Sequence, residues 1–442
     1  MKRTTLILLL AAAVFGVVVY FLEIREGKPR DETTTETKKP AFTFTRSDVA
    51  AITVIRAGQS VTIDDHDGKW VISQPVNALA DESTIDSLVS SLTSARIERV
   101  LPAEPEKMRD FGLEEPRVIV EVKLKSGEEH RLRVGEKDFS ELSVYALLDE
   151  APDVAILGSS VLTSSDKSLD DLRDRAVLGV SQFDVKSLTL KNENGEIELD
   201  KTDGKWSIKR PIDAPADESE VSSLISDATS AKATEFVADA QPDPAKYGID
   251  KPKITLTAKL NDGSERVLTL GSKVDDNHYA RNSDRPQIVK IDSDLYEKLN
   301  VKLAKLRDKQ ILKVDKEELT RIEIKNPNLT LVAEKDKDKD KWLIKSPADK
   351  KDKEARTTKL LDPLETKATE VLDAAPASAK AKLAKPAVEV QVTDKSGKTT
   401  SLSISSADGD DVYVSVKGRP GVYKVGKQML DDLSFKIADV VD

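Results

Sequence analysis

The stretch Asp67-Gly-Lys-Trp-Val-Ile-Ser-Gln-Pro75 occurs a second time as Asp203-Gly-Lys-Trp-Ser-Ile-Lys-Arg-Pro211. A third copy, Trp342-Leu-Ile-Lys-Ser-Pro347, keeps the tryptophan, the isoleucine and the proline. These tryptophans are the only ones in the chain, and each is 136 residues from the next. A chain of 442 residues is long enough for about three domains. The spacing therefore predicts three tandem copies of one unit, each large enough to bury its own core.

Each copy begins with residues that alternate between apolar and polar, a pattern typical of strands with one buried face. Asp67-Gly68 and Asp203-Gly204 separate two such strands and are typical of tight hairpin turns. The third copy has the charged run 336–341 at this place, which no core could hold. In the first copy the alternating apolar pairs are Ile52 and Val54, Val61 and Ile63, and Trp70 and Ile72.

An amphipathic helix is expected next, because apolar residues there follow i, i+3, i+4, i+7 spacing. A hairpin and two more short strands with a tyrosine (Tyr145, Tyr279 or Tyr413) complete the pattern. Most consecutive strands are joined by hairpin-length links, so the predicted fold class is α+β, with three tandem repeats of an antiparallel sheet with packed helices. The helix positions are Ile85, Leu88, Val89 and Leu92, then Val221, Leu224, Ile225 and Ala228, then Thr357, Leu360, Leu361 and Leu364.

The N-terminus carries an uncharged run of 19 residues, Thr4–Leu22. As a helix this run would span roughly 28 Å, about the hydrocarbon thickness of a bilayer. Lys2 and Arg3 favour an N-terminus in the cytoplasm. A cleaved signal peptide and a buried soluble helix are the alternatives, but the run is long and ends in bulky residues. We expect a single-pass protein of the inner (cytoplasmic) membrane, held through residues 4–22, with its body in the periplasm or outside.

A segment rich in Thr, Lys and Glu follows the apolar run and has almost no apolar side chains, which is typical of a flexible stalk. The third copy of the repeat is degenerate, since it lacks several of the shared motifs. The expected division is a transmembrane anchor at 1–25, a flexible stalk at 26–45, repeat unit 1 at 46–178, repeat unit 2 at 179–312 and the degenerate repeat unit 3 at 313–442.

Composition excludes several classes of function. The net charge is −10, which argues against nucleic acid as a partner. Aromatic residues make up 4% of the chain, too few for an aromatic-lined glycan or single-strand groove. The chain has no cysteine, which excludes disulfides, thiolate metal sites and a cysteine nucleophile.

No motif in the chain carries recognisable catalytic or metal chemistry. Asp64-Asp-His-Asp-Gly68 resembles the start of a calcium loop, but Pro75 stands where the loop needs a bidentate glutamate. His66, His130 and His278 do not occupy equivalent repeat positions, and we expect them at the surface. The oxygen-rich stretch 275–278 is expected to be a solvated turn. We therefore expect no catalytic residue, no cofactor and no bound metal, and we do not expect an enzyme.

The segments Arg173-Asp174-Arg175 and Arg307-Asp308-Lys309 are the candidate functional residues. Each ends a predicted helix and lies at the boundary between two repeats. One interpretation is a helix-terminal charge cluster, in which the aspartate pairs with an arginine. The other is an interdomain latch or docking patch that locks each unit onto the next.

Four shared motifs point to a known family. They are the Asp-Gly-Lys-Trp turn, the Gly-Leu/Ile-x-x-Pro connectors (Gly112–Pro116 and Gly248–Pro252), a strand that ends in glycine before the tyrosine strand, and Leu-Arg-Asp-Arg/Lys. In this combination the chain resembles the bacterial domain-of-unknown-function 4340 family. The resemblance implies a single-span envelope protein, often encoded beside components of a gliding-motility-type ABC transporter. The family has no established activity, so the resemblance implies no catalytic residue.

The favoured hypothesis is a membrane-anchored extracytoplasmic interaction protein, an accessory of an ABC-type envelope transport complex. Its expected partners are ABC transporter subunits or other envelope proteins. The second hypothesis is a periplasmic ligand- or glycan-binding module that holds its ligand between repeats. An uncharacterised enzyme is the third.

Overall fold

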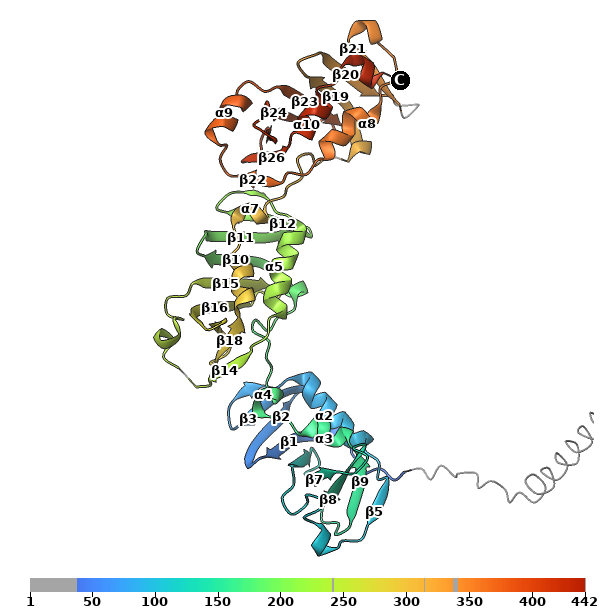
Figure 1. The fold of residues 1–442 in the computed structure, drawn as a ribbon, viewed down its shortest axis with the longest axis vertical. Helices are drawn as coiled ribbons and strands as arrows, with labels where there is room; N and C mark the ends of the chain where they lie inside the picture. The colour runs from blue at the N-terminus through green and yellow to red at the C-terminus, as the bar shows by residue number, and fades with distance from the viewer. Residues whose placement is uncertain (1–37, 241, 314, 337–340, 442) are drawn as a thin grey trace, which may run out of the picture. The chain divides into compact units, whose positions relative to one another are not determined.

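The computed structural model describes residues 38–240, 242–313, 315–336 and 341–441 (Figure 1). They divide into two compact units, one ending at Asp174 and the other beginning at Arg175. The expected anchor, and the stalk up to residue 37, lie outside the described residues. Within the described ranges, no helix has both the length and the apolar character needed to cross a bilayer.

The first unit contains one nine-stranded antiparallel sheet, in the order β4-β3-β2-β1-β6-β7-β8-β9-β5. Helices α2, α3 and α4 lie against one face of this sheet (Figure 1). Its strands are β1 (Val49–Arg56), β2 (Gln59–His66), β3 (Lys69–Gln74), β4 (Ala78–Leu79), β5 (Arg99–Leu101), β6 (Val118–Leu124), β7 (Glu129–Lys137), β8 (Ser143–Leu148) and β9 (Val154–Gly158). Its helices are η2 (Arg46–Asp48), α2 (Glu82–Ser94), η3 (Pro105–Lys107), α3 (Ser160–Ser165) and α4 (Leu169–Leu172).

The second unit begins with a sheet of the same order, β13-β12-β11-β10-β15-β16-β17-β18-β14. Its strands are β10 (Val185–Asn192), β11 (Gly195–Thr202), β12 (Lys205–Arg210), β13 (Ala214–Pro215), β14 (Glu235–Ala238), β15 (Ile254–Leu260), β16 (Glu265–Val274), β17 (Asn277–Asn282) and β18 (Ile288–Asp292). Its helices are η4 (Gln182–Asp184), α5 (Glu218–Ser230), η5 (Pro244–Tyr247), α6 (Ser293–Leu299) and α7 (Leu303–Leu306).

The second unit also contains an eight-stranded sheet, β21-β20-β19-β23-β24-β25-β26-β22. Its strands are β19 (Leu319–Lys325), β20 (Thr330–Lys335), β21 (Trp342–Ser346), β22 (Glu370–Leu372), β23 (Val388–Asp394), β24 (Thr399–Ile404), β25 (Asp411–Val416) and β26 (Val422–Gly426). Its helices are η6 (Lys316–Glu318), η7 (Ala348–Lys350), α8 (Thr357–Leu361), η8 (Asp362–Glu365), α9 (Ala377–Leu383), α10 (Gln428–Leu433) and α11 (Ile437–Val440).

The antiparallel sheets with packed helices agree with the predicted fold class. The alternating residues of β1, β2 and β3 point into the core, and so do the apolar positions of α2. Asp81 caps α2, because its carboxylate accepts a hydrogen bond from the backbone N of Thr84 at 2.8 Å. In the third repeat the corresponding helix is shorter, since Pro363 converts its second half into the 3-10 helix η8.

Two of the shared motifs form opposite sides of one contact. The connector around Gly112, which has a φ of 65°, passes directly over Gly135 on β7. A Cβ at Gly135 would lie 2.1 Å from the carbonyl oxygen of Phe111. The backbone N of Glu136 donates to that same carbonyl at 2.9 Å. The second repeat has the same arrangement at Gly271, so glycine is required there by the close approach of another segment of backbone.

The packed part of the first repeat begins inside the range that was expected to be stalk. Phe42 and Phe44 are both 6% exposed and belong to the core of the first sheet. Pro40 forms a bridge with Arg96, and the backbone N of Ala41 donates to Ala95. Two buried aromatic rings explain why this segment packs although its neighbours in sequence are polar.

The contact at Gly135 yields a stability prediction. Gly135→Ala would force the connector away from β7, and we expect the free energy of unfolding of the first unit to fall by roughly 2 kcal/mol or more. Gly158→Ala is the matched control, because a Cβ there meets nothing closer than Ser160 Oγ at 3.8 Å. Hydrogen exchange of the β7 and β9 peptides in the full chain measures both variants. Equal effects of the two substitutions would contradict the role of the contact.

Candidate functional site

The two Arg-Asp segments occupy equivalent places in the first two repeats. Each follows a four-residue helix, α4 or α7, and leaves it in an extended conformation. Arg173 forms a backbone bridge with Ala80, and Arg307 forms one with Ala216. Each arginine therefore lies where its own repeat still holds the chain through the backbone edge beside β4 or β13.

The side chain of Arg307 reaches from the second repeat into the third. Its Nη1 donates to Asp373 Oδ1 at 2.8 Å and to the carbonyl of Leu372 at 3.5 Å, and its Nη2 donates to the carbonyl of Pro420. Arg307 is only 2% exposed, so the guanidinium charge has been taken out of water. Burial of a charge is unfavourable unless it is paired and hydrogen-bonded, and these three acceptors supply both conditions.

Gly421 makes room for this guanidinium. Its φ is 86°, and a Cβ at this position would lie 2.6 Å from Arg307 Nη1 and 2.5 Å from the carbonyl of Leu372. Any other side chain would displace the arginine. The pocket for Arg307 is thus built from the end of β22 and the turn between β25 and β26.

A second arginine holds the same boundary from the opposite direction. Arg419 Nη1, from the third repeat, donates to the carbonyls of Gln310 and Ile311 at 3.0 Å each. Arg285, which lies 134 residues earlier in the second repeat, donates to the carbonyl of Ala176 at 2.9 Å. In the second and in the third repeat, an arginine from the hairpin that contains the tyrosine strand therefore fixes the segment that leads into that repeat.

The remaining candidate residues have separate surroundings. Arg173 is 2% exposed, and its Nη1 lies 3.4 Å from Asp170 Oδ1 within the first unit. The backbone N of Asp174 donates to the carbonyl of Leu79. Arg175 Nη1 lies 3.5 Å from the carbonyls of Ala233 and Thr234 within the second unit.

The expected pairing of aspartate with a neighbouring arginine is wrong for Asp308. Its carboxylate accepts a hydrogen bond from the backbone N of Gln310 at 2.8 Å and forms an ion pair with Lys313. It turns away from Arg307 because that side chain is directed into the third repeat. The backbone carbonyl of Lys309 accepts a hydrogen bond from the backbone N of Ala368 at 2.9 Å, and Lys309 is partly buried.

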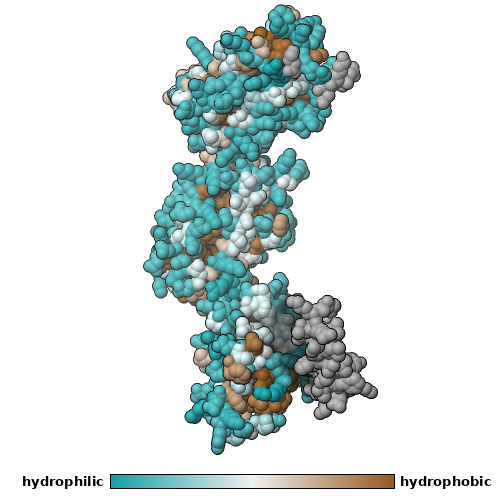
Figure 2. Space-filling model, turned by 45° about the vertical axis from the view of Figure 1, so that its right-hand side comes forward, coloured by the Kyte–Doolittle hydropathy of each residue, from teal (hydrophilic) through white to brown (hydrophobic). Residues whose placement is uncertain are grey.

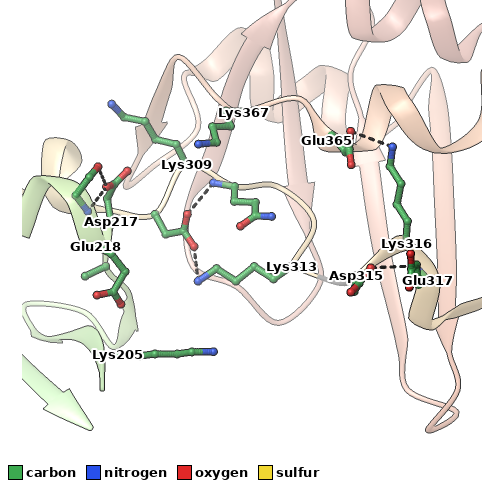
Figure 3. A pocket seen from close by; sticks show the side chains of 14 residues that line it. Lys205, Asp217, Glu218, Lys309, Lys313, Asp315, Lys316, Glu317, Glu365 and Lys367 are labelled. Atoms are coloured by element: carbon green, nitrogen blue, oxygen red, sulfur yellow. Dashed lines mark hydrogen bonds and ion pairs between the residues drawn. The ribbon is translucent and has the colours of Figure 1, made fainter. Parts of the chain in front are cut away.

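Asp308 and Lys309 also line a cleft of about 890 Å³ within the second unit (Figure 3). Its walls come from the second repeat, from the segment that joins the two repeats, and from the third repeat. Charged side chains of both signs dominate the lining. They are Lys205, Asp217, Glu218, Asp308, Lys309, Lys313, Asp315, Lys316, Glu317, Glu365 and Lys367.

Two of these charges are stabilised by hydrogen-bond partners. Burial raises the pKa of Asp217, but hydrogen bonds from Ser219 and Glu220 outweigh this effect, and the pKa lies below its ordinary value. Burial lowers the pKa of Lys316, yet hydrogen bonds to Asp362 and Glu365 raise it overall. These two groups therefore stay charged at neutral pH and are not poised to exchange a proton.

Three lysines of the cleft differ from Lys316. Among the described residues, none forms an ion pair with the amines of Lys205, Lys309 or Lys367. Figure 3 shows Lys367 and Lys205 on opposite sides of the opening. The cleft has five lysines and six carboxylates, so it offers charges of both signs to a polar ligand.

The expectation that all three histidines lie at the surface is wrong for His278. It is 6% exposed on β17, and its ring stacks on Tyr296 with centroids 4.1 Å apart. His130 is partly buried against Phe42 and Phe44, whereas His66 is exposed. Across the described ranges, no group of three or more acidic or histidine side chains is placed to hold a metal ion.

These features define a tandem-repeat α+β protein whose second and third copies are joined by buried polar contacts. A family model described as a domain of unknown function, DUF4340, matches residues 70–209 and 206–386. The chain therefore belongs to the DUF4340 family. No curated protein matches the chain.

Sequence reasoning missed the partners of the candidate arginines. Arg285 and Arg419 are 134 residues apart, which is also the spacing of the tyrosines. An alignment of the repeats on the tyrosines would have revealed this pair. It would not have shown which groups they contact, because the partners of Arg307 are 66 and 113 residues away in sequence.

Removal of the buried guanidinium should weaken the second unit. We expect Arg307→Ala to lower its free energy of unfolding by roughly 2–5 kcal/mol, since Asp373 and two carbonyls lose their donor. Arg210→Ala is the control, because the Arg210 side chain is 70% exposed and, among the residues that the structure describes, forms an ion pair with Glu198 alone, so about 0–1 kcal/mol is expected. Denaturant unfolding and protease cleavage within residues 308–316 measure the difference. Similar losses in both variants would refute a latch at Arg307.

The buried histidine predicts a pH dependence. Burial lowers the pKa of His278 below 6.5, with smaller effects from Gly271, Lys273 and Glu297. The unfolded chain therefore binds this proton more readily, and stability should fall as the pH drops through about 6.5. His278→Phe keeps a ring against Tyr296 and should make the stability of the second unit less dependent on pH. Exposed His66→Phe should leave the slope unchanged, and an unaltered slope in His278→Phe would contradict the assignment.

Proposed function

We propose that this protein is a membrane-anchored extracytoplasmic interaction protein, an accessory of an ABC-type envelope transport complex. The observation that carries the proposal is the buried guanidinium of Arg307, which is bonded to Asp373 and Pro420 of the following repeat. A buried, directional contact holds two copies of the fold in one relative placement. The two copies then present one continuous surface to which a large partner can bind.

The family and the N-terminal sequence support the envelope part of the proposal. The chain belongs to DUF4340, whose resemblance implies single-span envelope proteins encoded beside transporter components. The run Thr4–Leu22 has the length of a membrane span, and Lys2 and Arg3 would keep its start in the cytoplasm. The body would then lie in the periplasm or outside.

The lysine-lined cleft favours a second candidate, a ligand- or glycan-binding module. Within the described part of the chain, the amines of Lys205, Lys309 and Lys367 form no ion pair at the junction of two repeats. Such a cleft, with charges of both signs, suits a glycan or another polar ligand. An enzyme is the least supported candidate, because the charges of Asp217 and Lys316 are stabilised rather than tuned toward neutral pH.

Affinity purification of the tagged full chain from gently solubilised membranes tests the proposal. We expect ABC transporter subunits to co-purify with the wild-type protein, and we expect their recovery to fall severalfold with Arg307→Ala. Arg210→Ala should retain them. A chain that purifies without transporter subunits but with a glycan or another polar metabolite would favour the ligand-binding candidate, and Lys205→Glu together with Lys367→Glu should then abolish that binding.

A further inference from the structure

The turn between β7 and β8 exposes two large apolar side chains. Phe139 is 100% exposed and Leu142 is 75% exposed, although hydrophilic residues cover most of the surface seen in Figure 2. Full exposure of a phenylalanine is unfavourable in water. Two exposed apolar side chains in a single turn indicate a contact with a membrane or with another protein.

The turn is held in one conformation by its own hydrogen bonds. Asp138 Oδ1 accepts from Ser140 Oγ at 2.8 Å and from the backbone N of Ser143 at 3.2 Å. The backbone N of Ser159 donates to the carbonyl of Leu142 at 2.8 Å. Phe139 and Leu142 are therefore presented by a fixed loop, so less conformational entropy is lost when they enter a binding partner.

The other two repeats have no large apolar residue at this place. Asp275-Asp276 joins β16 to β17, and the stretch 405–410, whose one apolar residue is Ala407, joins β24 to β25. Only the first repeat, which follows the apolar run 4–22 in the chain, carries Phe139 and Leu142. The apolar turn is therefore a property of one repeat rather than a requirement of the fold.

The turn lies beside the point where the described chain begins. Lys38 Nζ is 2.9 Å from Glu98 Oε1, and Ser143 Oγ donates to Glu98 Oε2 at 2.8 Å. Ser143 immediately follows Leu142. Fifteen residues separate Leu22 from Lys38, and a chain of that length spans at most about 50 Å.

We propose that the Asp138–Leu142 turn is a lipid-contacting loop, in which Phe139 and Leu142 enter the interface of the bilayer that holds residues 4–22. This inference rests on the proposed membrane anchor. The two side chains project from a turn, and a bilayer interface accepts exposed Phe and Leu without a shaped pocket. The carboxylate of Glu141 lies 3.9 Å from Lys137 Nζ, which reduces the cost of bringing its charge near lipid.

The absence of cysteine from the sequence allows a direct test. Phe139→Cys in the full chain is labelled with an environment-sensitive fluorophore and reconstituted in phosphatidylethanolamine–phosphatidylglycerol vesicles. We expect its emission to shift to shorter wavelength and to be quenched by lipids that carry a nitroxide near the headgroup. The matched control is Leu79→Cys, because Leu79 is 46% exposed but lies on β4, the edge strand at the other end of the first sheet, and its probe should remain in water.

Leu142→Cys provides an independent position, and Phe139→Asp in that background should reduce its quenching. A probe at 139 that stays in water while the chain remains in the vesicles would overturn the lipid contact alone. A wavelength shift without quenching would overturn it in favour of a protein partner. A chain that leaves the vesicles in alkaline carbonate would overturn both this contact and the anchor.

Discussion

Each repeat depends on one sheet face that must be covered. The strands alternate apolar and polar residues, so Ile52, Ile63 and Ile72 gather on a single side, where α2 covers them. The close approach at Gly135 and Gly271 belongs to a second, smaller core, in which Leu113 of the first connector packs with Leu147 and Val154. The connector that follows α2 or α5 must cross the sheet, and it can do so only where no Cβ intervenes.

The junction between the second and third repeats uses polar contacts instead of apolar ones. Arg307 extends from the second repeat and donates to the carbonyl of Pro420. Arg419 extends from the third repeat and donates to the carbonyl of Gln310, on the other side of the boundary. Apolar packing tolerates many relative placements, whereas a guanidinium aligned with fixed acceptors tolerates few. The buried charge thus contributes more to a defined arrangement than to net stability.

The repeats share a fold but differ where they face solvent. The second unit has a charged cleft beside Lys309, and the first has the apolar turn at Phe139. Such differences lie in loops, because loop residues can change without loss of the sheet core. The common core and the separate loops are consistent with one scaffold that carries a different contact in each copy.

The sequence alone determined the three-fold repetition, the strand alternation and the amphipathic helix, since these depend on local periodicity. Asp67 and Gly68, with φ of 55° and 88°, form the hairpin turn that their identity predicts. The third repeat's shorter helix also follows from a proline in the sequence.

Only the tertiary structure decided which side chains are buried at a junction and which remain exposed. Arg307, Arg210 and Arg109 are the same residue type, but only Arg307 meets Asp373 and Pro420 across a repeat boundary. Likewise, the polar residue His278 is buried and the apolar residue Phe139 is exposed, which is the reverse of what their polarity suggests. Local pattern defines which face of a strand or helix is apolar, whereas burial of a single side chain depends on residues that folding brings together from distant parts of the chain.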